Sequence, residues 1–128
     1  MTYYVAGILF GDALSKVMLI RKSHPDRMKG KLNGIGGHIK LDESPLKAMR
    51  REFTEETGRK VTYWKKFAVI TGKDKAKKPW WVHWYTASIT NSTNYTAISD
   101  INTLQDEPVS WFDIESVVYG LHGNVMPN

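Results

Sequence analysis

A short helix with clear boundaries is the strongest structural signal in the sequence. Ser44 can cap the first amides of a helix, and Pro45 suits the first helical position because its missing N–H would go unpaired there. Gly58 suits the position that ends a helix. At about 100° per residue, the segment between them places one apolar stripe on the helix: Leu46, Met49 and Phe53. We therefore expect a helix over Pro45–Thr57 that packs on a sheet through this stripe.

Three glutamates crowd the flank of that stripe. Relative to Glu52, Glu56 lies about 40° to one side and Glu55 about 60° to the other, so the carboxylates share an arc of about 100°. Like charges this close destabilise a helix, more so when partly buried, so the arrangement requires a compensating cation. One source is a solvated face with salt bridges from Lys47, Arg50 and Arg51. The other is a hard divalent ion, with Mg²⁺ the default beside phosphates.

The wider pattern around the helix favours the divalent ion. From Gly37 to Gly58 the sequence reads GHIKLDESPLKAMRREFTEETG. It resembles the Nudix box, G-x5-E-x7-R-E-U-x-E-E-x-G-U with U a bulky apolar residue, and Phe53 supplies the first U. Every fixed position matches: Gly37, Glu43, Arg51, Glu52, Glu55, Glu56 and Gly58. Arg59 is the one departure, because the family usually has an aliphatic residue there. On segment 37–59 the chain is identified as a member of the Nudix hydrolase family, similar to MutT.

This resemblance implies a fold and a reaction. It implies a single domain over residues 1–128, an α/β protein with an α/β/α sandwich and a mixed β-sheet. It implies hydrolysis of a nucleoside diphosphate linked to another group, with Mg²⁺ or Mn²⁺ held against the diphosphate while water attacks phosphorus. Phosphoryl transfer depends on charge neutralisation and alignment, which bound metal supplies.

The resemblance also implies site residues. It assigns the metal ligands as Glu52, Glu55, Glu56 and the carbonyl of Gly36. Arg51 would orient the glutamates and Glu43 would support the loop. The base that activates water differs between family members, and the candidates are Glu52, Glu55 and a carboxylate before the last strand, Glu107 with Asp106 as second choice. An ordinary loop acid ahead of Pro108 is the alternative for Glu107.

A glycine-rich segment before the helix bears on the substrate. Residues 31–37, KLNGIGG, are similar to the W-N-G-F-G-G-K segment of the Nudix branch that hydrolyses oxidised purine nucleoside triphosphates. In that branch the asparagine contacts the base, so Asn33 is a base-binding candidate, and Gly37 a candidate in a glycine-lined pyrophosphate cradle. Leu32 replaces the tryptophan and His38 the lysine, so the match is partial. A turn-forming role for Asn33 is at least as good a reading.

An aromatic strand and two basic segments supply further substrate-binding candidates. Because strand neighbours alternate faces, Trp81 and Tyr85 share one face of strand 80–89, and we take them as the pair that stacks on a base. Core packing competes with this reading. Arg21, which ends an apolar run, is a further candidate. The four lysines in loop 73–78 would steer a polyphosphate or an RNA 5′ end, or simply solubilise a hairpin tip.

The remaining pattern predicts alternating strands and loops. The apolar runs predict strands over 5–10, 16–21, 61–70, 80–89 and 109–112, and a short helix over 114–121. Segment 33–37, with three glycines, should turn tightly or approach another part of the chain closely. Loops are expected over 24–30, 71–78 and 90–107.

Composition limits the class of protein. The 128 residues carry a net charge of +5, which suits polyanionic partners, and no cysteine, which excludes disulfides, thiolate zinc sites and a cysteine nucleophile. The apolar run at 5–10 is far shorter than the roughly 20 residues of a membrane-spanning helix, and signal-peptide features are lacking, so we expect no membrane partner and a cytoplasmic protein. Homodimers occur among relatives and are a further possibility here.

Three functions follow in order of preference. The first is Mg²⁺-dependent hydrolysis of a nucleoside triphosphate, including an oxidised or non-standard purine one, to the monophosphate and pyrophosphate. The second shares the chemistry and acts on an RNA 5′ end or another nucleoside diphosphate derivative. The third is a nucleotide-sensing module without catalysis, which predicts erosion of the acidic set, whereas Glu52, Glu55 and Glu56 are intact.

Overall fold

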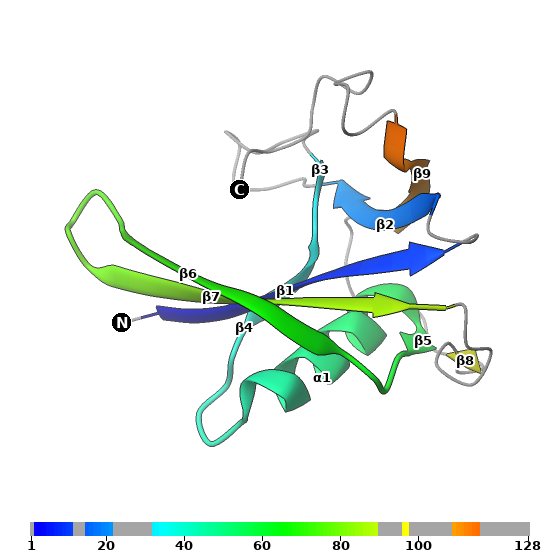
Figure 1. Cartoon of the computed structure of the whole chain (residues 1–128). Coiled ribbons are helices and arrows are strands. Elements are labelled where there is room, and N and C mark those ends of the chain that lie inside the picture. Colours follow the sequence, from blue (N-terminus) through cyan, green and yellow to red (C-terminus); the bar gives the residue numbers. More distant parts are fainter. Residues whose placement is uncertain (1, 12–14, 22–31, 90–95, 98–108, 116–128) are drawn as a thin grey trace.

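The chain folds around one mixed β-sheet with a helix on one face (Figure 1). The computed structural model describes residues 2–11, 15–21, 32–89, 96–97 and 109–115. The main sheet contains β1 (Thr2–Gly11), β2 (Lys16–Arg21), β3 (Leu32–Asn33), β4 (Ile35–His38), β6 (Lys65–Lys73), β7 (Pro79–Ser88) and β9 (Val109–Asp113). β5 (Arg59–Lys60) and β8 (Thr96–Ala97) form a separate small ladder. The helix α1 spans Pro45–Thr57, and the mixed sheet agrees with the expected α/β fold class.

The strand β1 is the centre of the sheet. It pairs in parallel with β7 along nearly its whole length. On its other edge it pairs antiparallel with β4 through Tyr4–Gly7 and with β2 through Leu9–Gly11. The remaining order is β3-β2-β1-β7-β6, with β9 alongside β2.

The glycine-rich segment forms strands, which the sequence reading did not include. Residues 33–37 were expected to turn or to approach another segment closely, and the structure contains strands β3 and β4 there. The close approach is with β1, because a Cβ atom added at Gly36 would clash with the backbone carbonyl of Val5. Glycine at this position therefore lets β4 lie against β1.

The helix α1 has the predicted boundaries. The Ser44 hydroxyl accepts a hydrogen bond from the backbone N–H of Lys47 at 3.2 Å. Gly58 adopts a left-handed φ of 69°, and its N–H donates to the carbonyl of Thr54. The apolar stripe faces the sheet as expected: Met49 and Phe53 are fully buried, and Leu46 packs at their edge.

Two apolar clusters lie on opposite faces of the sheet. The larger one joins α1 to the odd-numbered side chains of β1, such as Val5 and Leu9. The smaller one contains Val17 and Leu19 with neighbours from β1 and the segment after β9. Of the helix expected over 114–121, only residues 114–115 are described, and they are helical. The rest of this predicted helix, on which the second helical layer of the expected sandwich depends, falls outside the described residues.

The strand predicted over 61–70 begins later than expected. β6 starts at Lys65 and runs on to Lys73, so part of the predicted loop 71–78 is strand. Val61 and Trp64 are instead buried in the core that packs against α1. The Trp64 indole N–H donates a hydrogen bond to the Val61 carbonyl at 3.1 Å. The strands at 80–89 and 109–112 were each placed within one residue. In the described parts of the chain, no helix is long and apolar enough to span a membrane.

Candidate functional site

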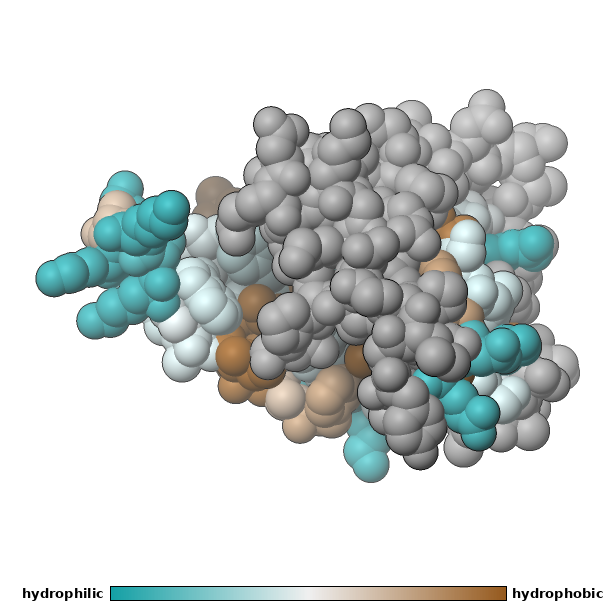
Figure 2. All heavy atoms as spheres, turned by 90° about the horizontal axis from the view of Figure 1, so that it is seen from above, coloured by the Kyte–Doolittle hydropathy of each residue, from teal (hydrophilic) through white to brown (hydrophobic). Residues whose placement is uncertain are grey.

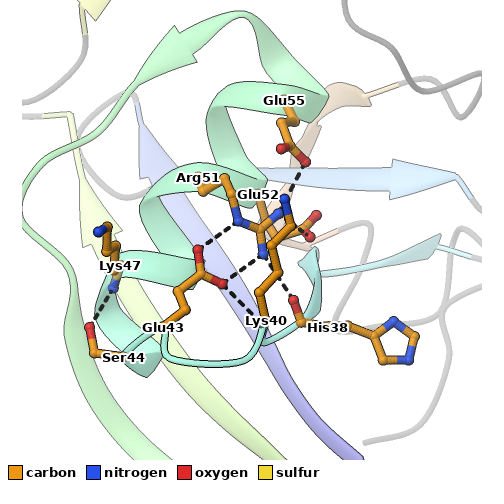
Figure 3. Close-up of polar contacts among 8 residues, drawn as sticks. All are labelled: His38, Lys40, Glu43, Ser44, Lys47, Arg51, Glu52 and Glu55. Carbon is orange, nitrogen blue, oxygen red and sulfur yellow. Dashed lines mark hydrogen bonds and ion pairs between the residues drawn. The ribbon is translucent and has the colours of Figure 1, made fainter.

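Arg51 organises the acidic side chains of α1 (Figure 3). Its guanidinium binds Glu43 with two parallel hydrogen bonds, Nε to Oε2 at 2.7 Å and Nη2 to Oε1 at 2.9 Å. Nη1 donates to Glu52 Oε1 at 2.8 Å and to Glu55 Oε2 at 3.2 Å. Nη2 also donates to the carbonyl of His38, the last residue of β4, at 2.9 Å. One side chain thus ties the loop, the helix and the strand together.

The Arg51 network perturbs the ionisation of Glu43. The hydrogen bonds from Arg51, together with one from the backbone N–H of Lys40, lower the pKa of Glu43 to about 2, against a smaller opposing effect of burial. The same contacts raise the pKa of Arg51 above its usual value. Both groups are therefore held in their charged forms, and the loop before α1 is anchored to the helix.

Glu52 and Glu56 are buried where α1 faces the sheet, although both are acids. A Cβ atom added at Gly37 would lie 2.6 to 2.7 Å from the carboxylate atoms of Glu52. Glycine in β4 therefore leaves room for this carboxylate against the strand. The Glu55 side chain keeps 34% of its surface exposed, so the acidic arc runs from the buried side of the helix to solvent.

The donor set fits a divalent cation. Arg51 uses only one oxygen of Glu52 and one of Glu55. The single guanidinium faces the three carboxylates of Glu43, Glu52 and Glu55, so these four side chains together carry a net charge of −2. Carboxylate oxygens with that charge deficit suit a hard divalent ion. Among the described residues, no group of three or more acidic or histidine side chains is arranged to hold a metal ion.

Asn33 is the last residue of β3 and precedes Gly34, which joins β3 to β4. Its side-chain oxygen accepts a hydrogen bond from the N–H of Gly34 at 2.8 Å. Its amide N–H groups donate to no acceptor in the described parts of the chain. Gly34 lies against the Trp84 indole, since a Cβ atom there would be 3.1 Å from the ring. Asn33 thus keeps two donors after fulfilling its structural role.

The two aromatic candidates on β7 have different surroundings. Trp81 and Tyr85 share the face that carries α1, as strand alternation predicted. Tyr85 is 4% exposed within the main core, so base stacking on it does not fit the structure, because apolar packing already uses the ring. Trp81 stacks on Tyr3, with ring centroids 5.0 Å apart and an interplanar angle of 16°. The sequence reading missed Tyr3, which only the pairing of β1 with β7 brings to Trp81.

The other candidates are placed in part. Gly36 lies in β4, paired with Ala6. Arg21 ends β2, paired with Leu32, and its side chain lies outside the described part of the chain. Glu107 and Asp106 also lie outside the described residues.

Comparison with known proteins adds family information. The sequence profile described as the NUDIX domain matches residues 2–127. No curated protein matches the sequence. A NUDIX hydrolase from Nitrosomonas europaea is similar in structure, with a TM-score of 0.76, 19% identity, and coverage of 98% of this chain and 80% of that one. A MutT NUDIX hydrolase from Burkholderia pseudomallei gives a TM-score of 0.71 and 18% identity, over 89% and 84% of the two chains. The NUDIX domain of Shewanella oneidensis NrtR, solved with ADP ribose, gives a TM-score of 0.67 and 24% identity, over 91% of this chain and 75% of that one.

Proposed function

Because the chain belongs to the Nudix family of hydrolases, we propose that it hydrolyses a nucleoside triphosphate to the monophosphate and pyrophosphate with Mg²⁺. The observation that carries this proposal is the Arg51 network, in which one guanidinium faces three carboxylates beside the glycines of β4. The net negative charge of this network favours a divalent cation next to a strand whose backbone a phosphate can approach. Mn²⁺ satisfies the same oxygen ligands.

We take the residue roles from the match to the Nudix box. In this proposal Glu52, Glu55 and Glu56, with the carbonyl of Gly36, would hold the metal, which would supply charge neutralisation for the phosphates and a lowered pKa for bound water. Arg51 positions the glutamates, and Glu43 positions Arg51 through its paired hydrogen bonds. The carboxylate that accepts the proton of the attacking water is Glu52, Glu55 or Glu107. Gly37 leaves space for the Glu52 carboxylate.

We assign nucleotide recognition to side chains outside the acidic network. We assign the base contact to the free amide donors of Asn33, which suit the acceptors of a purine edge. The partly exposed Trp81 offers an aromatic surface for stacking. Arg21 is the candidate for a phosphate contact. An oxidised purine is one form of this substrate.

A nucleoside diphosphate linked to another group is the second candidate. The structurally similar NrtR domain was solved with ADP ribose, and the acidic network at α1 makes no contact that selects a third phosphate over a sugar. The two candidates differ in products, since a triphosphate yields pyrophosphate and a diphosphate sugar yields two monophosphates. A screen of nucleoside triphosphates and diphosphate sugars with Mg²⁺ or Mn²⁺, reading released phosphate species, separates them.

Replacing Glu56 tests the catalytic assignment. We expect Glu56→Gln to keep the fold and to lose nearly all metal-dependent turnover, on the order of a hundredfold or more, because it removes a metal ligand. Mn²⁺ affinity, measured by titration without substrate, should fall in parallel. Glu115→Gln is the matched control, because Glu115 is an exposed acid after β9. Unchanged turnover in Glu56→Gln would refute the assignment, and nucleotide binding without turnover by the wild type would identify a sensing module instead.

A further inference from the structure

The β6–β7 hairpin carries the whole net charge of the protein. Residues 65–88 contain six lysines and a single acid, Asp74, so their net charge is +5, equal to that of the entire chain. The other residues are balanced overall. Lysines clustered on one projecting hairpin produce a stronger local positive potential than the same lysines spread evenly over the surface.

The tip of this hairpin is a hydrogen-bonded turn that is fully exposed. Asp74 closes the turn, because its carboxylate accepts from the N–H of Lys78 at 2.9 Å and its backbone N–H donates to the Lys78 carbonyl at 3.0 Å. All residues of segment 73–78 are exposed, and Figure 2 shows a hydrophilic projection at this end of the molecule. No carboxylate pairs with the four tip lysines within the described residues. Four unneutralised ammonium groups are thus held together in solvent.

Exposed rings lie where this tip joins the sheet. The Tyr3 ring is 43% exposed and stacks on Trp81. On the opposite face, Trp80 lies against Gly72. Aromatic faces beside lysines suit single-stranded nucleic acid, because unpaired bases stack on rings while the phosphates meet the cations. A protein partner with acidic residues would use the lysines but would not require flat rings.

The register of the sheet connects this surface with the acidic site. Tyr3 pairs with Trp81, and Trp81 with Thr71, on the face that carries α1. The Tyr3 carbonyl accepts from the N–H of Ile39, which follows the His38 carbonyl bound by Arg51. Val5 follows Tyr3 by two residues on β1, which is about 7 Å at the usual rise of a strand. Val5 pairs with Gly37, and Gly37 lies against the Glu52 carboxylate. Two residues outward, Lys73 pairs with Pro79 at the tip.

From these observations we propose that the β6–β7 hairpin is a binding arm for single-stranded nucleic acid, with the Tyr3–Trp81 stack as its base platform, leading toward the acidic site. Hydrolysis of a bound 5′ end rests on the proposed function, whereas binding of the strand does not. The arm adds a polynucleotide substrate or ligand to a site that otherwise needs only a free nucleotide.

The test measures binding without metal. A single-stranded RNA of about a dozen nucleotides, within the usual site sizes, carries a fluorophore at its 3′ end and is titrated by anisotropy over a salt series in EDTA. We expect Lys75/Lys78→Ala to reduce the slope of log K against log salt by about 1.4 and to weaken binding roughly tenfold at 0.1 M salt. Lys47/Lys60→Ala removes the same charge from α1 and β5 and should change binding far less. Equal losses of RNA affinity in the two double variants would refute the proposal that the hairpin is a binding arm.

A second variant tests the aromatic platform. Tyr3→Leu keeps apolar bulk at an exposed position and should weaken single-stranded RNA binding about fivefold or more, with little effect on a duplex of equal length. Thermal melting checks that the variant is folded. A polyglutamate competitor at equal charge should displace RNA poorly, and equal displacement would show a general anion surface and refute the proposal.

Nucleotide hydrolysis separates the two proposals. Lys75/Lys78→Ala should hydrolyse free nucleotides with unchanged kcat/KM, because these lysines lie outside the acidic network. If the wild type hydrolyses nucleotides but does not bind RNA, the binding-arm proposal is refuted and the proposed function is unaffected. RNA binding without turnover of any nucleotide would support the arm and count against the proposed function.

Discussion

Replacing Glu43 by glutamine removes the charge that anchors Arg51 while keeping the shape of the side chain. The pKa of Glu43 falls from 4.5 to about 2 on folding, which corresponds to about 3 kcal/mol for full ionic coupling. Arg51 keeps part of its exposure, so solvent screening reduces this, and we expect a loss of roughly 1–2 kcal/mol in the free energy of unfolding at pH 7. For a domain of this size that is about 3–8 °C in Tm.

The destabilisation should depend on pH with a defined sign. Because the folded pKa lies below the unfolded value, the ionised carboxylate stabilises the wild type fully above pH 4.5, and this contribution is lost as the pH falls toward 2. The difference in unfolding free energy between wild type and Glu43→Gln should thus be constant from about pH 6 upward and shrink steadily below pH 4.5.

Urea unfolding followed by tryptophan fluorescence at a series of pH values measures this difference. Glu115→Gln, on an exposed acid whose removal breaks no such network, is the control and should show neither the loss nor the pH dependence. A Glu43→Gln protein as stable as the wild type at pH 7, or a deficit that persists unchanged below pH 3, would refute the coupling between Glu43 and Arg51.

The other predictions concern the glycines and the helix cap. Gly37→Ala should lower turnover about tenfold or more but cost little stability, because the added Cβ meets only the end of the Glu52 side chain and no backbone atom. Activity assays together with urea unfolding test this, and unchanged activity would contradict it. Gly36→Ala should instead lose several kcal/mol of stability, because the clash is with the backbone of β1; a Tm near that of the wild type would contradict the close approach of β4. Ser44→Ala should cost about 1 kcal/mol by removing the cap of the Lys47 amide, and Ser44→Asp should recover it; equal stability of the three proteins would show that the cap contributes nothing.

Local signals predicted the helix and much of the site. The boundaries of α1 follow from Ser44, Pro45 and Gly58, each of which acts on its immediate neighbours. The spacing of the glutamates along α1 likewise follows from helix geometry alone, so the crowding of acids was visible in the sequence. Strand alternation correctly grouped Trp81 with Tyr85.

Contacts between distant segments decided the rest. That Tyr85 belongs to the core while Trp81 reaches Tyr3 depends on which part of β7 lies over α1, and this is a property of sheet register. The pairing of β4 with β1 and the delayed start of β6 have the same origin. Arg51 lies on the same helix as Glu52 and Glu55, yet it makes its two parallel hydrogen bonds with Glu43 in the preceding loop. Periodicity reports which side chains share a face, but only the packing of separate elements determines what each face meets.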